Sequence, residues 1–153
     1  MDEYSGTEGK IIMKIDAIKN GIVIDHITPG CGMQLYDMLG LDKLDCSVAI
    51  IKNAPSAKMG KKDIIKIDSN IDVNLDIISY VSPDATVNII ENEVCKEKRR
   101  IELPDRLINI IKCKNPRCIT TIEQELPHEF VLTDRNEREY RCVYCDTKAE
   151  TQL

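Results

Sequence analysis

The chain of 153 residues is long enough for one or two domains, and 42% of its residues are hydrophobic. With no tryptophan and one phenylalanine, its core must be aliphatic. A formal net charge of −5 argues against a nucleic-acid partner, because such proteins usually carry a basic excess. No apolar run reaches the roughly 18 residues of a membrane span, and the acidic, polar start Met1–Glu8 does not resemble a signal peptide. We therefore expect a cytoplasmic protein without membrane contact, where paired cysteines are more often metal ligands than disulfides.

Strand and helix patterns alternate through residues 11–91. Alternating polar and apolar residues predict a strand over 11–19. The Asn20-Gly21 pair then favours a hairpin turn, because both residues tolerate positive φ. Gly40 is a typical helix stop, and apolar residues at i, i+4 and i+7 from Ile71 indicate a helical stripe. In total we expect strands over 11–19, 22–27, 46–52, 61–68 and 85–91, helices over 33–39 and around 71–78, and a loop over 54–60.

Without its first strand, this order of elements is β-α-β-β-α-β, the ferredoxin-like order. We predict an α+β fold, in which two helices cover one face of an antiparallel sheet. In the strand over 61–68, Ile65 and Ile67 should face one side, and Lys62 and Lys66 the other. The face without helices would be partly open, which suits a ligand or a second subunit.

Residues 96–100 are predicted to be a charged link, and Leu103-Pro104 marks a domain boundary. The expected domains are 1–102 and 103–153. The second domain should be small, all-β and similar to a zinc ribbon, with a hairpin formed by residues 130–133 and 139–143.

Four cysteines in the second domain come as two close pairs, Cys113 with Cys118 and Cys142 with Cys145. Structural zinc takes four soft ligands in a tetrahedron, and gaps of four and two residues lie within the usual ligand spacing. We predict one structural Zn²⁺ ion here. Two disulfides or buried free thiols are the simpler alternative, and a redox pair fits less well because four ligands close the site. A domain as small as residues 103–153 can hardly build a sufficient hydrophobic core. We therefore expect this domain to unfold without metal.

No motif predicts catalysis. His26 and His128 are the only histidines, and neither lies beside a plausible nucleophile in the sequence. The basic stretch 58–62 lacks the spacing of a phosphate-binding loop. Acidic residues are scattered without a pattern of paired general acid and base.

Basic residues offer a second kind of site. Lys62 and Lys66 would share one face of a strand, and residues 96–100 add another basic group. These could hold phosphates while Asp25 and Asn88 read hydroxyl or amide edges. The alternative is that they are solvated surface charges, which is the norm for lysine.

The cysteine-rich half carries no basic excess. Residues 104–153 contain eight Lys or Arg and nine Asp or Glu residues. A zinc module that does not bind nucleic acid is most often a surface for docking another protein. The remaining cysteines, Cys31, Cys46 and Cys95, are expected to be small buried hydrophobic residues.

Several short segments, in order, resemble the regulatory chain of aspartate carbamoyltransferase, from about Lys14 to Cys145. The matching pieces are Ile15-Asp-Ala-Ile-Lys19, Gly21, Val23-Ile-Asp-His-Ile27, Pro55-Ser56, Met59-Gly-Lys-Lys-Asp63, Ile65-Lys-Ile67, Pro83, Ala85-Thr-Val-Asn88, Leu103-Pro104 and the four paired cysteines. No single piece is specific, but their order along nearly the whole chain is.

The resemblance implies a non-catalytic subunit of pyrimidine biosynthesis. Residues 1–102 would bind the effectors CTP, UTP and ATP, and residues 103–153 would dock on the catalytic chain. Regulatory chains would form homodimers that bridge two catalytic trimers. Lys98 would hold triphosphate, Lys62 ribose or phosphate, and Lys66 a base carbonyl or ribose. The implied effector-binding positions are Asp16, Ala17, Ile18, Val23, Asp25, His26, Lys62, Lys66, Asn88, Ile90, Lys98 and Arg100, with backbone near Ile18 and Ile90 reading the base.

The chain departs from the family pattern at residues 92–95, where Glu93 stands in the place of a frequent aromatic residue. A carboxylate near a triphosphate is electrostatically unfavourable, so Glu93 bears on which nucleotide binds best. Two other functions are consistent with the residues alone: a stand-alone zinc ribbon that binds nucleic acid, and a free-standing nucleotide sensor without a catalytic partner.

Overall fold

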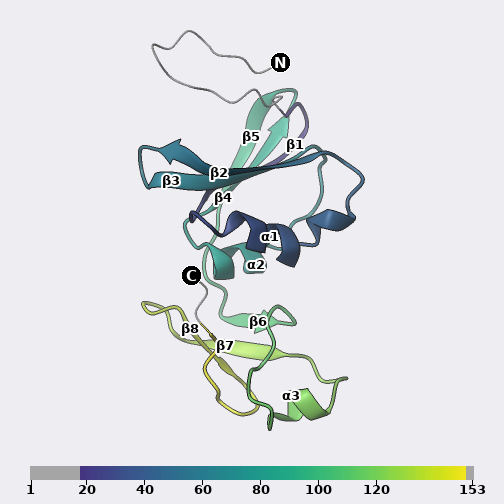
Figure 1. Cartoon of the computed structure of the whole chain (residues 1–153), viewed down its shortest axis with the longest axis vertical. Helices are drawn as coiled ribbons and strands as arrows, with labels where there is room; N and C mark the ends of the chain where they lie inside the picture. Colours follow the sequence, from purple (N-terminus) through teal and green to yellow (C-terminus); the bar gives the residue numbers. More distant parts are fainter. Residues whose placement is uncertain (1–17, 151–153) are drawn as a thin grey trace.

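The computed structural model describes residues 18–150, which form an antiparallel sheet with helices on one side and a smaller sheet beyond them (Figure 1). None of the helices in this range is long and apolar enough to cross a bilayer. Most of the expected strand over 11–19 lies outside the described residues. The elements are β1 (Gly21–Ile27), α1 (Gly32–Met38), the 3₁₀ turn η1 (Leu41–Lys43), β2 (Val48–Ser56), β3 (Gly60–Ile67), α2 (Leu75–Val81), β4 (Thr86–Glu91), β5 (Val94–Arg100), β6 (Arg106–Ile108), α3 (Ile119–Ile122), β7 (Glu129–Asp134) and β8 (Glu139–Cys142).

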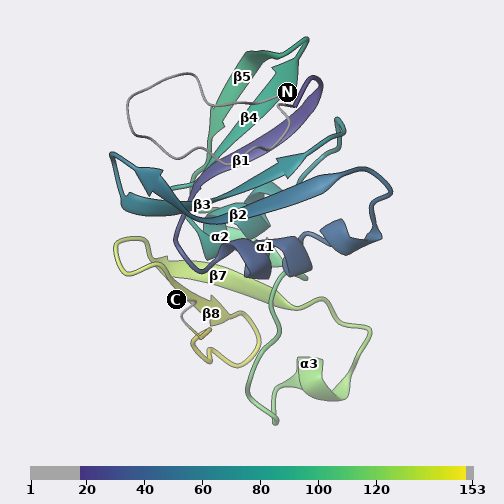
Figure 2. The same ribbon diagram turned by 45° about the horizontal axis from the view of Figure 1, so that its top comes forward.

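The first sheet has the order β2-β3-β1-β4-β5, with every neighbouring pair antiparallel. Its first four strands and two helices have the predicted ferredoxin-like order, and β5 extends the sheet at the β4 edge. Helices α1 and α2 lie on the same face (Figure 2). Among the described residues, no helix covers the opposite face. The predicted fold class is confirmed.

Strand alternation builds the core between this sheet and its helices. Ile22 and Ile24 of β1 and Ile65 and Ile67 of β3 are buried on the helix side, where they form one cluster with Leu35 of α1. Residues between them, such as Lys66, are only half-buried on the other side. The aliphatic core expected from the composition is therefore present, and isoleucine is its main component.

A buried carboxylate connects three parts of the first domain. Asp63 of β3 is fully buried, and its carboxylate accepts hydrogen bonds from the backbone N–H groups of Gly30, Gly32 and Asn53 at 3.0–3.1 Å. Gly30 and Gly32 flank the start of α1, and Asn53 lies at an irregularity of β2. A side chain at position 32 would place its Cβ 2.9 Å from the carboxylate.

Two predictions of local structure are wrong because they relied on short-range patterns. Gly21 is not in a hairpin turn; it begins β1 and pairs with Ile90. A Cβ at Gly21 would lie 2.1 Å from the carbonyl oxygen of Ile67, so close backbone approach, and not positive φ, accounts for this glycine. Residues 96–100 are not a link but belong to β5, whose side chains are all exposed.

Other expectations differ in detail. Strand β2 continues through Pro55, at the sheet edge, into the segment expected to be a loop. Of the three cysteines expected to be buried, Cys31 is buried, Cys46 is half-buried and Cys95 is exposed on β5. The helix stop is as expected, since Gly40 adopts φ 67° after α1.

The second sheet has the order β6-β7-β8 and contains the predicted hairpin, formed by β7 and β8. Its core is small: Leu107, Phe130 and Tyr140, with Cys118 and Cys142, are its buried residues. Strand β6 and helix α3 were not expected, because each is too short to leave a periodic signal.

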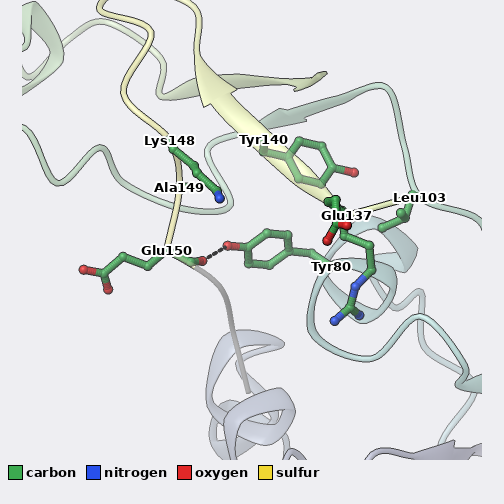
Figure 3. A pocket seen from close by; sticks show the side chains of 8 residues that line it. Tyr80, Leu103, Glu137, Tyr140, Lys148, Ala149 and Glu150 are labelled. Atoms are coloured by element: carbon green, nitrogen blue, oxygen red, sulfur yellow. Dashed lines mark hydrogen bonds between the residues drawn. The ribbon is translucent and has the colours of Figure 1, made fainter. Parts of the chain in front are cut away.

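Two tyrosines form a contact between the first domain and the second (Figure 3). The ring of Tyr80, from α2, packs edge-to-face on Tyr140 of β8, with centroids 5.7 Å apart. The Tyr80 hydroxyl donates to the carbonyl of Glu150 at 2.8 Å, and the Tyr140 hydroxyl donates to that of Pro104 at 2.6 Å. Burial raises the pKa of Tyr140 to about 12, so its hydroxyl stays protonated as a donor at neutral pH.

Candidate metal centre and ligand face

The four paired cysteines converge at one point of the second domain. Their Sγ atoms all lie within 4.8 Å of one another, with 3.5 Å between Cys113 and Cys145 and 3.7 Å between Cys118 and Cys142. A tetrahedron with Zn–S distances of about 2.3 Å has sulfur–sulfur edges of about 3.8 Å. A disulfide needs about 2.05 Å, and all four are free thiols. The geometry therefore suits a four-coordinate metal and not two disulfides.

Hydroxyl groups support two of these sulfurs. Thr120 Oγ1 lies 3.1 Å from Cys118 Sγ, and Thr147 Oγ1 lies 3.0 Å from Cys145 Sγ. The Cys145 thiol donates to Thr147 Oγ1 while it is protonated. Once a thiol is deprotonated, a hydroxyl at this distance can donate to the thiolate, which orients the ligand and partly neutralises its charge. Each threonine follows its cysteine by two residues, so the support is built into the same turn as the ligand.

The pKa values of these thiols differ because their surroundings differ. Burial raises the pKa of Cys113 to about 12 and also raises that of Cys142. The hydroxyl of Thr147 lowers the pKa of Cys145 to about 6 by stabilising its thiolate. A dication would overcome the burial effect, because thiolates bind metal in the deprotonated form. The donor set fits one structural zinc ion, as the spacing predicted.

The open face of the first sheet brings together residues that are far apart in sequence. Lys66 of β3 is paired with Val23 of β1, which is paired with Asn88 of β4, and Asn88 is paired with Lys98 of β5. Because paired residues project to the same side of a sheet, these four form one row. Val23, Lys66 and Asn88 are half-buried, and Lys98 is exposed. We call this surface the ligand face.

A second row of paired residues lies two strand positions away from the first row. Asp25 is paired with Thr86, and Thr86 with Arg100. Lys62 Nζ lies 3.0 Å from Asp25 Oδ1, so this lysine is already partly neutralised. The ligand face thus carries four basic residues and one acidic residue, with Lys66, Lys98 and Arg100 outside that ion pair.

His26 lies at the edge of the ligand face in a left-handed backbone conformation, with φ 57°. It occupies an irregularity in the β1–β3 pairing. Its Nδ1 lies 3.3 Å from Thr86 Oγ1, and its backbone N–H donates to Asp25 Oδ1 at 2.7 Å. A non-glycine residue at positive φ is uncommon and marks places where function is worth testing.

Of the effector positions implied by the resemblance, Asp16 and Ala17 lie outside the described residues. Ile18, Val23, Asp25, His26, Lys62, Lys66, Asn88, Ile90, Lys98 and Arg100 are on or beside the ligand face. Sequence reasoning missed Thr86, which joins Asp25 to Arg100, because only the strand register brings these residues together. It also missed the exposed thiol of Cys95, which is opposite Ile90.

The fold and the cysteine cluster define a class of two-domain proteins, in which a βαββαβ domain with an open, basic face is followed by a separate four-cysteine metal module. Models of two protein families match these parts. The aspartate carbamoyltransferase regulatory chain, allosteric domain, matches residues 13–102. The metal binding domain of the same chain matches residues 105–152.

Relatives of known family are similar to this chain in sequence over most of its length. A regulatory chain from Clostridium botulinum is 51% identical, covering 88% of this chain and 92% of its own length. A regulatory chain from Clostridium tetani is 48% identical, covering 88% of this chain and 94% of its own length. A regulatory chain from Bifidobacterium longum is 38% identical, covering 90% of this chain and 99% of its own length. The chain belongs to the family of aspartate carbamoyltransferase regulatory chains, so it has an allosteric and a metal-binding domain and its partner is a catalytic chain.

Proposed function

We propose that this chain is a non-catalytic subunit that binds CTP, UTP and ATP on the ligand face and passes the effect to catalytic trimers. Residues 1–102 would be the effector domain and residues 103–153 the docking domain. Two regulatory chains would pair through their first domains, and no nucleic acid would bind. The observation that best supports the proposal is the row of Lys66, Val23, Asn88 and Lys98 across four strands.

The row suits a nucleoside triphosphate because it combines cations with an amide and an apolar surface. Lys98 and Arg100 carry charge for phosphates at the β5 side. Asn88 can donate and accept, which suits ribose hydroxyls or a base edge. Val23, half-buried between Lys66 and Asn88, supplies apolar contact.

Nucleotide binding should depend on Lys98 but not on its neighbour Arg99. Strand alternation points Arg99 to the helix side, where it lines a hollow with Val87 and Ile89. We expect Lys98→Ala to weaken CTP binding by about tenfold or more, through loss of a charge-assisted contact. Arg99→Ala removes the same charge and should change it by less than about twofold. Isothermal titration calorimetry of the zinc-loaded chain measures both, and equal effects of the two variants would contradict the proposed site.

The proposed docking surface is made of exposed apolar residues of the second domain. Seven large hydrophobic residues are exposed in residues 18–150, and five are in the second domain: Ile108, Ile119, Ile122, Val143 and Tyr144. They come from β6, α3 and the turn between Cys142 and Cys145. The Val143 N–H donates to the carbonyl of Glu129, and the Tyr144 hydroxyl donates to that of Pro127. Such a concentration of apolar surface is typical of an interface.

We expect Ile122→Asp to weaken assembly with the catalytic trimer by roughly tenfold or more, since a charge would enter a desolvated contact. Ile122 is 65% exposed, so the variant should fold normally. Met33→Asp, at the 46% exposed Met33 of α1, is the matched control. Sedimentation velocity of each variant mixed with catalytic trimer gives the assembled fraction; unchanged assembly of the Ile122 variant would place the interface elsewhere.

A further inference from the structure

The helix side of the first sheet is incompletely covered. Strand β5 extends the sheet at the β4 edge, beyond the part that the two helices cover (Figure 2). Side chains that β4 and β5 direct to this side therefore border an open space. The segment that leads from β3 into α2 forms the other wall. The result is a hollow of about 190 Å³, on the opposite side of the sheet from the ligand face.

The floor and walls of the hollow are aliphatic. The lining side chains of this kind are Ile22, Ile71, Val73, Leu75, Val87 and Ile89. Ile22 and Val87 are buried at the base, and the other four are half-buried. An apolar cavity of about 150 Å³ can hold a benzene molecule. The hollow therefore has room for a branched aliphatic side chain.

The wall between β3 and α2 is held at both ends. The backbone N–H of Asp68 donates to the carbonyl of Ser47 at 2.9 Å. At the other end, Asn74 Oδ1 accepts from the N–H groups of Asp76 and Ile77 at 3.0 and 3.3 Å, which caps α2. The hollow is therefore formed before any ligand binds, as is usual for small-molecule sites.

Two opposite charges stand at the rim of the hollow, Arg99 of β5 and Asp72 of the wall. The hydrogen bond with Glu97 raises the pKa of Arg99, and the charge of Asp72 adds to this effect, so Asp72 and Arg99 lie within electrostatic reach of each other. Arg99 donates its Nε–H to Glu97 at 2.5 Å. Within residues 18–150, its two terminal amino groups have no hydrogen-bond acceptor, and Asp72 forms no hydrogen bond or ion pair through its side chain.

We propose that this hollow binds a free amino acid with a branched aliphatic side chain, such as leucine or isoleucine. The α-carboxylate would accept from the terminal amino groups of Arg99, and the α-ammonium would donate to the carboxylate of Asp72. The side chain would lie on the aliphatic floor, where its burial is favourable. This site is separate from the proposed nucleotide site and does not depend on it.

Three ligands with the same aliphatic group distinguish the contributions of the two charges. Leucine carries both, isocaproate lacks the ammonium group, and isoamylamine lacks the carboxylate. In a chemical-shift titration of the isotope-labelled, zinc-loaded chain, we expect leucine to shift the backbone amides of Ile71, Val73 and Ile89. The affinity should be in the millimolar range, as for other ligands of so few atoms. Each of the two singly charged ligands should bind about fivefold or more weakly, because one charge-assisted contact is lost.

Substitutions at the rim test the same assignment from the side of the protein. Asp72→Asn should weaken leucine binding by about fivefold or more and leave isocaproate binding unchanged. Asp68→Asn is the matched control, since this exposed carboxylate does not line the hollow. Arg99→Ala should weaken leucine but not CTP, and Lys98→Ala should do the reverse, because the two residues lie on opposite sides of the sheet.

Three results would overturn the proposal. The first is that leucine leaves the amides around the hollow unshifted at concentrations well above the millimolar range. The second is equal leucine affinity of the Asp72→Asn and Asp68→Asn variants. The third is isocaproate binding as tight as that of leucine, which would show that the carboxylate at the rim does not recognise an ammonium group.

Discussion

Replacing Cys113 with alanine is expected to unfold the second domain and abolish assembly with the catalytic chain. The variant loses one of four zinc ligands, and the remaining core is small because two of its five buried residues are themselves cysteines of the cluster. Structural zinc contributes about 10–16 kcal/mol of apparent folding free energy in small modules. That exceeds what such a core supplies on its own, given total domain stabilities of about 5–15 kcal/mol.

Nucleotide binding should survive in the Cys113→Ala variant, because the first domain has a separate core of its own. Zinc content measures the loss of the metal, limited proteolysis measures the unfolding of the second domain, and sedimentation with the catalytic trimer measures the loss of assembly. Cys95→Ala is the matched control, since this exposed cysteine lies outside the cluster. Assembly that persists without bound zinc would show that the metal does not build the docking surface.

Asp63→Ala is expected to lower the free energy of unfolding of the first domain by about 3–5 kcal/mol. The change leaves three backbone N–H groups, at Gly30, Gly32 and Asn53, without their common acceptor. An unsatisfied buried donor costs about 1–3 kcal/mol, and charged acceptors are at the upper end of that range. Urea unfolding of the zinc-loaded chain, followed by circular dichroism, gives the difference.

Asp68→Ala serves as the control for that measurement. Asp68 directly follows β3 and is exposed, so the variant should differ from the wild type by less than about 0.5 kcal/mol. If both variants have the same stability, the Asp63 carboxylate does not hold α1 and β2 in place.

The sheet and its helices could be predicted from sequence because buried isoleucines alternate regularly with polar residues. In β3, Ile65 and Ile67 are buried and Lys66 is not, as the pattern requires. Strand β5 carries no such signal. It is an edge strand in the described sheet, and its run of lysine, glutamate and arginine is typical of edges that must not pair further.

The metal centre was predictable from spacing, because consecutive turns bring close cysteine pairs to one point. The ligand face was not predictable to the same extent. Its central row depends on the register of four strands, which places Lys66 and Lys98 on one line although they come from different hairpins. Asp63 was missed for a related reason: its three donors come from residues 10 to 33 positions away.

Nucleotide binding on the ligand face is expected to change the behaviour of catalytic chains docked on the metal-binding domain. An effector can do this only through different affinities for two states of the assembly. Such coupling typically amounts to about 1–3 kcal/mol. Because the ligand face and the metal centre lie in different domains, we expect the domain joint, where Tyr80 packs on Tyr140, to take part.

The most direct test is the aspartate saturation curve of enzyme reconstituted from this chain and catalytic trimers, with and without CTP or ATP. We predict that each nucleotide shifts the aspartate concentration at half-saturation in the wild-type assembly, and that Lys98→Ala abolishes or strongly reduces the shift. Superimposable wild-type curves at nucleotide concentrations that saturate the chain would contradict the account.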